Sequence, residues 1–502
     1  MAGRFLAFDL GAESGRSILG TVEGFHVTLA EVSRFANRMV SREGHLHWDV
    51  PGLLGRVKQA IGGCASGMVE LPGPLTSVGF DTWGVDFALL DANGEMLGLP
   101  YTYRDSRTDG AMNGFFKRVP REHVYGLTGI QMMPFNTLYQ LYALAQHDYR
   151  QLESASDLLF MPDLFNYFLT GVKASEFTFA TTSQMFNPRK RDWEDELIGA
   201  LGISREIMQE VVEPGTVIGE ASAAVCRETK LEPGVQVVAV GSHDTASAVA
   251  AVPAEGDGWA FISSGTWSLM GVETAGPVIN ADTLRLNFTN EGGVGGTFRL
   301  LKNITGLWLL NRCREEWATG VGARTYDELA EWAAGAPPFS SIIDPDYSGF
   351  SNPPSMSVAI AKYCLRTDQE IPEEPAHLAR IILEGLALKY REVLEHIREV
   401  HPGRIDRIHV VGGGARNELL CQFTASATGL PVIAGPFEAT ALGNVMSQAQ
   451  AMGVVSGLAE SREIIRNSFE LEIYLPEDTG EWLSAYERFI GISRKSSTIF
   501  DL

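Results

Sequence analysis

The chain has 502 residues, 45% of them hydrophobic, and a formal net charge of −22 at neutral pH. This length is too great for one simple core and predicts two domains of roughly 250 residues each, and no apolar run is long enough to span a bilayer. The acidic excess repels nucleic acid and anionic membranes, so we expect neither as a partner, although backbone N–H groups can still form a local anion site.

The first half of the chain predicts a mixed sheet. Strands are expected at residues 4–10, 17–22, 25–35 and 75–80, and helices at about 50–68, 138–145 and 161–169. The glycine turn at 11–16 joins the first two strands into a hairpin, and residues 87–91 with the Ala-Asn-Gly turn at 92–94 predict another. Residues 104–223 are less regular, with a polar surface turn at 189–193, and we expect them to cover the ligand site.

The second half repeats this plan. We expect a second hairpin at 258–272, strands at 407–411 and 431–434, and helices at 376–400, 418–428 and 439–452. The pattern therefore predicts an α/β protein whose two domains have mixed sheets flanked by helices and face each other across a ligand-binding cleft. The expected divisions are 1–248, 249–480 and a helical tail at 481–502.

The five cysteines, at 64, 226, 313, 364 and 421, are scattered, without a CxxC pair or a histidine at metal spacing. They predict buried reduced thiols in a cytoplasmic protein. The first residues lead directly into a strand and lack the apolar core of a signal peptide, which favours the same location.

The strongest candidate for chemistry lies at 235–248. A buried strand over 235–240 ends at Gly241, and Ser-His-Asp-Thr follows before small residues at helical spacing. Because α/β sheets bind ligands at the carboxyl ends of their strands, we predict that Asp244 is a general base that accepts a proton from a sugar hydroxyl. The alternative is that Asp244 only caps a helix.

Phosphoryl transfer requires phosphates held by N–H groups, a Mg²⁺ ion and a base that orients the acceptor. The turn at 11–16, with Arg16, can hold phosphate, and Gly265-Thr266 and the glycines at 412–414 predict nucleotide contacts in the second half. The chain has no Walker motif. Asp9 and Asp244 are the candidate Mg²⁺ ligands. A plain turn, or a turn-forming aspartate, is the alternative for each of these features.

For the acceptor, Trp83 offers an apolar face to a sugar ring. Hydrogen-bond partners for hydroxyl groups are available at Asp81, Asp86, His243 and Asn303. We expect His243 to donate a hydrogen bond to the substrate and not to act as the base. The alternatives are core packing for Trp83 and a structural role for His243.

In combination, these motifs resemble the FGGY carbohydrate kinases. The resemblance runs in order from residue 4 to about 450, through residues 9–16, 81–87, 103–107, 134–140, 242–247, 263–271, 303 and 410–414. The runs at 81–86 and 242–247 are similar to the branch of that family that phosphorylates L-rhamnulose at its 1-hydroxyl. The resemblance implies an actin-like, ribonuclease H-like fold in each domain, with an N-terminal sugar-binding domain, a C-terminal nucleotide-binding domain and ATP between them.

The resemblance also implies that Asp244 is the proton acceptor. Implied nucleotide contacts are Ala12, Glu13, Ser14, Gly15, Arg16, Thr266, Asn311 and Gly413, and implied sugar contacts are Trp83, Gly84, His243, Asp244, Thr245 and Asn303. Two residues depart from the family pattern. Glu13 stands where other members carry a small hydroxyl residue, so its carboxylate should point away from phosphate, toward water or Mg²⁺. Asn311 stands where the family has a longer amide.

Two other functions remain open at this point. The chain could phosphorylate another ketose or polyol, such as fuculose or xylulose, because a single pocket contact can redirect hydroxyl selection. It could also be an actin- or chaperone-like ATPase, because fold alone does not choose between these activities. The oligomeric state is not fixed by the sequence.

Overall fold

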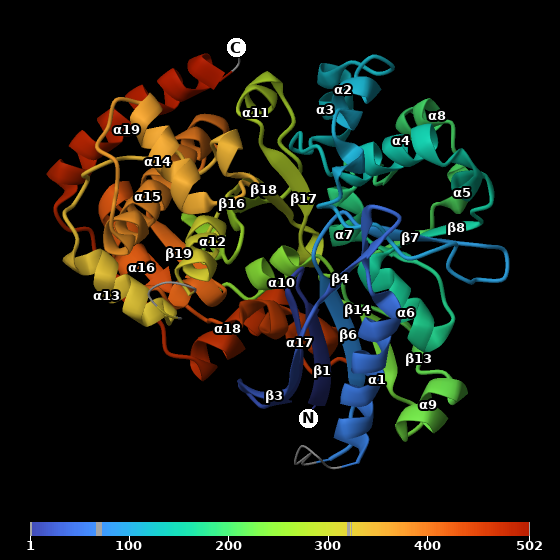
Figure 1. Cartoon of the computed structure of the whole chain (residues 1–502). Helices are drawn as coiled ribbons and strands as arrows, with labels where there is room; N and C mark the ends of the chain where they lie inside the picture. The colour runs from blue at the N-terminus through green and yellow to red at the C-terminus, as the bar shows by residue number, and fades with distance from the viewer. Residues whose placement is uncertain (1–2, 67–72, 319–321, 323, 501–502) are drawn as a thin grey trace. The chain divides into compact units, whose positions relative to one another are not determined.

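The computed structural model describes residues 3–66, 73–318, 322 and 324–500. Contacts divide the chain into two compact units, each built from discontinuous segments. The first comprises Met1–Pro253, Glu273–Leu300 and Ala439–Ser468, and the second Ala254–Val272, Leu301–Glu438 and Phe469–Leu502. The first unit therefore takes in the blue and most of the green parts of the chain together with the segment 439–468, which carries the labels α17 and α18 in Figure 1.

The main sheet of the first unit has six strands in the order β13-β14-β6-β1-β2-β3. These are β1 (Gly3–Leu10), β2 (Ser14–Glu23), β3 (His26–Ala36), β6 (Ser77–Thr82), β13 (Thr216–Glu220) and β14 (Gln236–Ala239). β1 pairs antiparallel with β2 and parallel with β6, which confirms the predicted hairpin and mixed sheet. The register places Asp9 opposite both Arg16 and Asp81, so charged side chains gather where the strands end.

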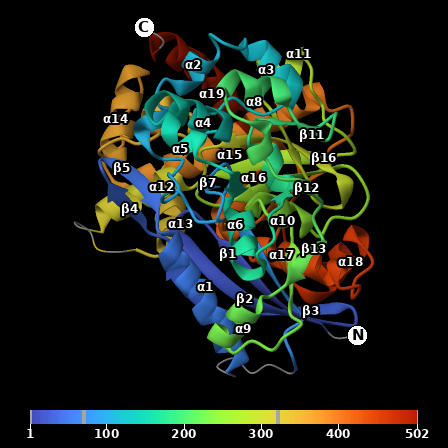
Figure 2. The same cartoon turned by 90° about the vertical axis from the view of Figure 1, so that its right-hand side faces the viewer.

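Helices cover both faces of this sheet. α1 (Val50–Ala65) lies along one face (Figure 2) and begins at Asp49, whose side chain accepts a hydrogen bond from Gly52 N. α1 and α6 (Met161–Thr170) share a hydrophobic cluster with Phe80. Neighbouring strand residues point to opposite faces, and Gly79 and Asp81 accordingly contact Asn444 of α17 (Ala439–Ala451) on the other side. The expected α1 end at 68 lies outside the described residues.

α17 crosses α10 (Asp244–Ala250) at very short range. A β-carbon added at Gly443 would lie 1.8 Å from the Ser247 carbonyl oxygen, so only glycine permits this approach. The close crossing fixes the helix that begins at Asp244 against a segment almost 200 residues later in the chain.

The region between β6 and β13 forms a helical layer with short strand pairs. It contains β7 (Phe87–Leu90), β8 (Asp157–Phe160), β9 (Ser175–Glu176), β10 (Phe186–Asn187), β11 (Asp192–Trp193), β12 (Val211–Val212), α2 (Ala111–Phe115), α3 (Arg121–Thr128), α4 (Thr137–His147), α5 (Tyr149–Glu153), α7 (Phe177–Thr182) and α8 (Asp195–Leu201). The predicted helices near 138–145 and 161–169 are confirmed. The predicted turn at 189–193 joins β10 to β11, but its last residue, Trp193, is buried.

The predicted hairpin after residue 87 forms, but it is short. Asp91 N donates to Glu95 O and Leu97 N to Leu89 O, with an antiparallel bridge between Leu90 and Met96. The ladder of β7 is with β8, about 70 residues away. All four β7 side chains are buried, so pairing with β8 places them in the core, which a local hairpin partner would not do.

The second unit repeats the plan of the first. Five of its strands follow the order β16-β15-β19-β20-β21: β15 (Trp259–Ser264), β16 (Ser268–Thr274), β19 (Arg407–Val411), β20 (Val432–Ala434) and β21 (Glu472–Tyr474). Its helices are α12 (Trp308–Trp317), α13 (Tyr326–Gly335), α14 (Met356–Arg366), α15 (Pro375–Val400), α16 (Glu418–Thr428) and α19 (Thr479–Phe500). As in β1-β2-β6, β15 is antiparallel to β16 and parallel to β19, which confirms the predicted repeat and the α/β class.

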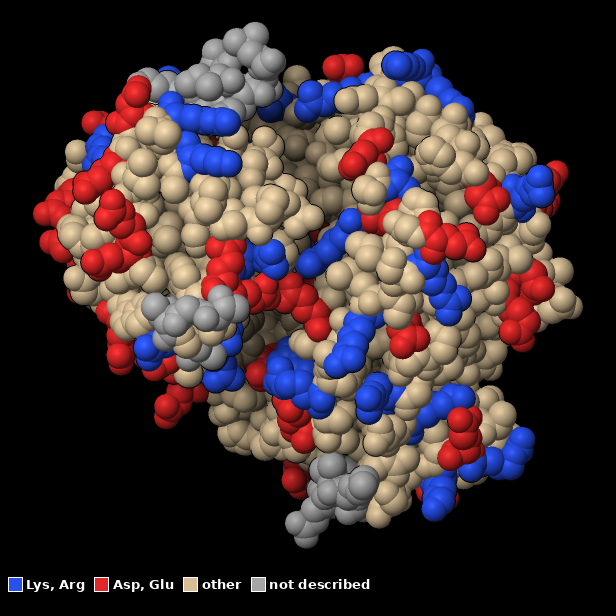
Figure 3. All heavy atoms as spheres, viewed as in Figure 1, with Lys and Arg blue, Asp and Glu red and all other residues tan. Residues whose placement is uncertain are grey.

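The remaining elements are β4 (Met39–Arg42), β5 (His45–Trp48), β17 (Thr289–Gly292), β18 (Phe298–Ile304), α9 (Ala223–Thr229), α11 (Ala281–Arg285) and α18 (Leu458–Ser468). All five cysteines are free and buried, as expected. Among the described residues, no helix is both long and apolar enough to cross a membrane. On the face drawn in Figure 3, acidic and basic side chains are intermixed and do not form a field of one sign.

Candidate active site

Asp244 lies at the first position of α10, directly after the end of β14. The connection is held in place by β6, because Thr82 N donates to the Ser242 carbonyl. The Asp244 side chain is 34% exposed, and its Oδ1 accepts a hydrogen bond from the Thr245 hydroxyl at 3.0 Å. The N-cap position belongs to His243 and not to Asp244. The carboxylate is therefore accessible at the end of a buried strand and is not the cap of its helix.

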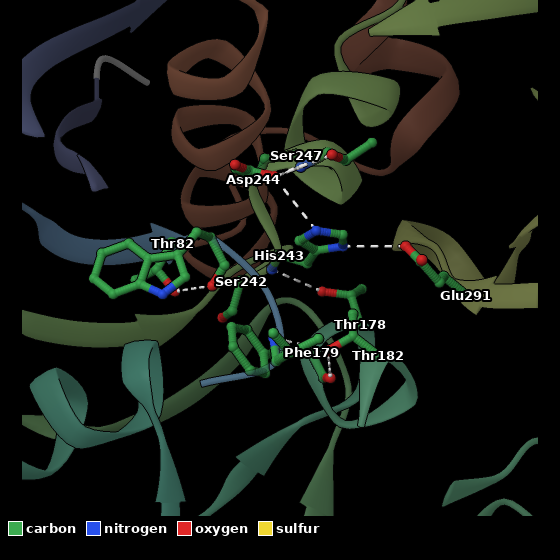
Figure 4. Close-up of polar contacts among 12 residues, drawn as sticks. Thr82, Thr178, Phe179, Thr182, Ser242, His243, Asp244, Ser247 and Glu291 are labelled. Atoms are coloured by element: carbon green, nitrogen blue, oxygen red, sulfur yellow. Dashed lines mark hydrogen bonds and ion pairs between the residues drawn. The ribbon is translucent and has the colours of Figure 1, made fainter. Parts of the chain in front are cut away.

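His243 lies between Asp244 and Glu291 (Figure 4). Its Nε2 is 3.4 Å from Asp244 Oδ1, and its Nδ1 is 3.2 Å from Glu291 Oε2. Its backbone N–H donates to the Thr178 hydroxyl of α7 at 3.2 Å. A β-carbon added at Gly84 would lie 3.3 Å from His243 Nε2, so a larger residue there would crowd the imidazole.

Glu176, the N-cap of α7, is hydrogen-bonded to the backbone just before His243. Its carboxylate accepts hydrogen bonds from the backbone of Thr178 and Phe179 and, at 3.2 Å, from Ser242 N. Burial raises the pKa of Glu176 to about 7, although these hydrogen bonds oppose the rise. This carboxyl group fixes the peptide before His243 and is not available to a ligand.

A second group of carboxylates gathers at the ends of β1 and β6. Asp9 forms an ion pair with Arg16 across the hairpin. Asp81 is fully buried; its Oδ2 accepts a hydrogen bond from Asn444 at 2.7 Å, and its Oδ1 has no hydrogen-bond partner among the described residues. Burial raises the pKa of Asp81 well above its usual range, and the nearby charges of Asp9 and Asp244 add to the rise. Asp81 therefore lies close enough to both Asp9 and Asp244 for their charges to act on it.

Trp83 and Asp86 are buried and make hydrogen bonds within the protein. Trp83 is 4% exposed, lies 4.1 Å from Trp48 between ring centroids, and donates its indole N–H to Asp86 Oδ2. Asp86 also accepts hydrogen bonds from Trp48, Tyr103 and Gln140. Burial raises the pKa of Asp86 to about 6 in spite of these donors. Trp83 therefore packs in the core, as the alternative interpretation expected. A contact between its ring and a sugar stays a prediction.

Between these two residues, the backbone at Val85 is strained. Its φ of 68° lies in the left-handed region, which β-branched residues avoid. The conformation is held by the Thr182 hydroxyl, which accepts from Val85 N, and by the Thr137 hydroxyl, which donates to Val85 O at 2.6 Å. Strain of this kind is characteristic of functional sites, and it positions the neighbouring Gly84 against His243.

The predicted phosphate turn forms at the tip of the first hairpin. Gly11 N donates to Ser14 O, and Asn37 ties the turn to the end of β3 by donating to Gly11 O and Glu13 O. Ala12 and Arg16 are half-buried, Gly15 is buried, and Glu13 and Ser14 are exposed. The Glu13 carboxylate forms an ion pair with Arg104 at 3.3 Å. The Glu13 side chain is therefore directed toward the Arg104 guanidinium.

The nucleotide candidates of the second unit meet at the end of β15. A β-carbon added at Gly414 would lie 2.1 Å from Ser264 Oγ, and Gly412, with φ of 86°, approaches Ser264 O closely. Gly413, by contrast, has open space on its α-carbon. The Gly265–Thr266 turn contacts the start of α12, where Leu307 N donates to Gly265 O and Trp308 N to Thr266 O. The two glycine turns therefore lie next to each other at the end of β15.

Two further candidates of the second unit lie on other elements. Asn303 is half-buried on β18. Asn311, on α12, accepts a hydrogen bond from the Tyr326 hydroxyl at 2.9 Å. The side-chain oxygen of Asn311 is therefore already hydrogen-bonded to Tyr326.

The comparisons with known proteins decide the family. The N-terminal domain model of the FGGY family of carbohydrate kinases matches residues 4–251, and the C-terminal domain model matches residues 260–452. The chain belongs to the FGGY family of carbohydrate kinases. It is therefore a sugar phosphotransferase, and membership of this family implies the use of ATP.

Several FGGY relatives are similar over nearly the full length. A protein of Bacteroides thetaiotaomicron named rhamnulokinase is 48% identical over 490 residues, which cover 97% of this chain and 99% of the relative. A rhamnulokinase of Pectobacterium carotovorum is 42% identical over 97% of this chain and 96% of the relative. The ligand-bound xylulose kinase of Lactobacillus acidophilus matches with a TM-score of 0.82 at 16% identity, covering 99% of this chain and 98% of that one. That likeness confirms the fold.

Sequence patterns did not identify Glu176, Glu291 or Arg299. All three lie outside the motifs, and each contacts His243 or the backbone of Ser242 from an element distant in the chain. A buried Glu two residues before Thr178, at the start of a helix, was the one available signal.

Proposed function

We propose that this FGGY kinase transfers the γ-phosphate of ATP to the 1-hydroxyl of L-rhamnulose, giving L-rhamnulose 1-phosphate and ADP. The observation that carries the proposal is the 48% identity, over 97% of the chain, to a protein named rhamnulokinase. The site supports it, since an accessible carboxylate and a histidine lie together at the end of a strand.

In this proposal Asp244 accepts the proton of the 1-hydroxyl as the phosphoryl group is transferred. Its partial exposure lets an incoming hydroxyl reach it, and Thr245 orients it through the hydrogen bond to Oδ1. His243 and Thr245 bind sugar hydroxyls beside it, and Gly84 leaves room for the sugar next to the imidazole. Asn303 and the ring of Trp83 complete the proposed sugar contacts.

The proposed nucleotide contacts are Ala12, Glu13, Ser14, Gly15 and Arg16 in the first hairpin, and Thr266, Asn311 and Gly413 in the second unit. Arg16 suits phosphate oxygens because its planar guanidinium donates in a fixed fork. For Glu13 we propose a contact through the backbone, since its carboxylate is paired with Arg104. The open space at Gly413 suits close approach of a nucleotide to the backbone.

We propose that Asp9 and Asp244 hold Mg²⁺. Among the described residues no group of three or more His, Cys, Asp and Glu is arranged to hold a metal ion, but Mg²⁺ commonly takes one or two carboxylates, with water and phosphate as its other ligands. The donor set fits, because Asp81 Oδ1 has no hydrogen-bond partner among the described residues, and Asp9 and Asp244 are both near enough to Asp81 for their charges to add to the effect of burial on its pKa. When bound, the ion would neutralise charge on the phosphates.

A panel of ketoses tests the proposal. The purified protein with ATP and Mg²⁺ is assayed for ADP release with L-rhamnulose, L-fuculose and D-xylulose, and the position of the new phosphate is determined by ³¹P–¹H coupling. We expect the highest kcat/KM for L-rhamnulose and phosphate on C1. A higher kcat/KM for another ketose would change the substrate, and ADP release indifferent to every sugar would favour an ATPase instead.

A further inference from the structure

A buried ion pair behind His243 has no role in the proposal so far. The Arg299 side chain, on β18, is 0% exposed, and the Glu291 side chain, on β17, is 6% exposed. Arg299 Nη2 lies 3.2 Å from Glu291 Oε2. Removing two charges from water is costly, and an apolar pair of similar volume is often at least as stable. The pair therefore invites an explanation beyond packing.

Arg299 also contacts the imidazole. Its Nε donates to the Gly292 carbonyl at 2.8 Å, which fixes the plane of the guanidinium, and its Nη2 makes a hydrogen bond of 3.3 Å to His243 Nδ1. A guanidinium has only donors, so this bond exists only while Nδ1 carries a lone pair. The ring proton then lies on Nε2, the nitrogen that faces Asp244.

Glu291 is the competing partner for the same ring nitrogen. Its Oε2 is 3.2 Å from Nδ1, a contact that would hold the proton on Nδ1 (Figure 4). Within the described part of the chain, however, Oε2 has no hydrogen bond of acceptable geometry, whereas the Arg299 bond meets the geometric requirement. Burial would raise the pKa of Glu291, but the charge of Arg299 and the contacts with His243 and Thr289 together outweigh burial, and the pKa is lowered. Glu291 thus remains ionised and balances the arginine.

We propose that Arg299, balanced by Glu291, is a positioning residue that fixes His243 as the tautomer with its proton on Nε2, so that this N–H donates to a sugar oxygen. The inference rests on the proposed function, which places the sugar beside His243. Nε2 lies 3.4 Å from Asp244 Oδ1 and beside Gly84, where the absence of a side chain keeps the imidazole uncrowded. An oxygen held there would lie beside the proposed proton acceptor.

The tautomer can be measured directly in the whole protein. ¹⁵N-histidine labelling reports which ring nitrogen is protonated, and the His243→Gln variant assigns the His243 signals. We expect the Nε2–H tautomer in the parent protein and loss of that preference in Arg299→Lys, whose single ammonium group cannot reproduce both guanidinium bonds. An Nδ1–H tautomer in the parent protein would overturn the proposal. This measurement does not depend on which sugar is phosphorylated.

Kinetics supply the second test. Arg299→Lys should raise the KM for L-rhamnulose by about tenfold, the effect of about one hydrogen bond, and leave the KM for ATP within about twofold. The exposed Arg285→Lys change on α11 is the matched control and should alter neither. In a His243→Ala background, Arg299→Lys should have almost no further effect on the sugar KM. An equal effect in both backgrounds would show that Arg299 acts independently of the imidazole.

Folding is controlled separately. Glu291→Gln keeps the shape of the pair but removes the carboxylate charge, and thermal unfolding of each variant is compared with the parent. A normal sugar KM in folded Arg299→Lys would overturn the inference. Failure of the parent protein to phosphorylate any ketose would overturn the proposed function, and the tautomer result would still stand.

Discussion

The two hairpins share one architecture but end in different chemistry. In the first unit, Asp9 is paired across the hairpin with Arg16 and lies beside Asp81 of the parallel strand. In the second unit, the corresponding pair across the hairpin is Ser264 and Ser268, and the parallel strand ends in glycines. One strand end is therefore charged, and the other is neutral and without bulk.

The difference between the two hairpins shows what the backbone contributes to ligand binding and what the side chains contribute. A strand–turn–strand unit beside a parallel strand exposes the same backbone positions in both cases. Carboxylates at those positions raise the pKa of Asp81 and suit cation binding and proton transfer. Glycines and hydroxyls permit close approach of a ligand to the backbone. The repeat thus explains the fold, whereas the function depends on which residues occupy the strand ends.

The largest effect on activity is expected when the carboxylate of Asp244, at the charged strand ends of the first unit, is neutralised. Asp244→Asn should lower sugar-dependent ADP release by at least about 10²-fold, because it removes the proposed proton acceptor, with only a mild effect on ATP binding. The side chain is 34% exposed, so the fold should tolerate the change. Asp282→Asn, an exposed aspartate on α11, serves as the control. Turnover within a few-fold of the parent would remove Asp244 from its role.

The next largest effect is expected when a side chain is added to the glycine turn at 412–414 of the second unit. No other described residue lies within 4 Å of a β-carbon added at Gly413, so Gly413→Ala should leave thermal stability almost unchanged. We nevertheless expect the KM for ATP to rise by about tenfold, through contact with the nucleotide itself. Gly480→Ala, which also meets open space, should leave it unchanged. An unaltered ATP KM in Gly413→Ala would argue against a nucleotide contact there.

Asp86 tests whether the carboxylate behind the charged end is structural. Its pKa is about 6 in the folded protein, against 3.8 in the unfolded chain, so unfolding releases a proton between these pH values. The free energy of unfolding of the parent should therefore fall as pH rises from 3.8 to 6, by at most about 3 kcal/mol from this group.

Asp86→Asn should remove that part of the pH dependence. Chemical denaturation of parent and variant at several pH values measures it, with Asp282→Asn again as the control. Parallel stability curves for the parent and Asp86→Asn would contradict the raised pKa.

The smallest effect is expected at Glu13, the carboxylate in the turn at 11–16 of the first hairpin. Because its carboxylate is paired with Arg104 and is 49% exposed, Glu13→Gln should change kcat and the ATP KM by less than about twofold. Steady-state kinetics at two Mg²⁺ concentrations provide the measurement. A marked gain in ATP affinity would indicate that the carboxylate faces the phosphates.

Elements defined by local periodicity could be predicted from the sequence. The hairpins at Asp9 and Ser264 and the helix of 26 residues at α15 follow from alternation, helical spacing and glycine turns. The placement of Asp244 after a strand was equally local. The pairing of β7 with β8 was not, since a short buried strand carries no information about its partner.

The candidate site divides in the same way. Asp9, Arg16 and His243 could be predicted as candidates because they lie at or close to the ends of strands. The roles of Trp83 and Asp86 depend on Trp48, Tyr103 and Gln140, and the buried pair behind His243 lies on β17 and β18. Such networks form only after distant segments pack together, so no motif signals them.

The contact between Gly443 and Ser247 has a consequence for protein engineering. A chimera that joins the first 250 residues of this kinase to the remainder of a relative would bring a foreign α17 against α10, where a single methyl group is too large. Exchange of sugar preference between family members should therefore transplant residues 273–300 and 439–468 along with the N-terminal segment. The unit of recombination is set by the helix crossing and not by the midpoint of the chain.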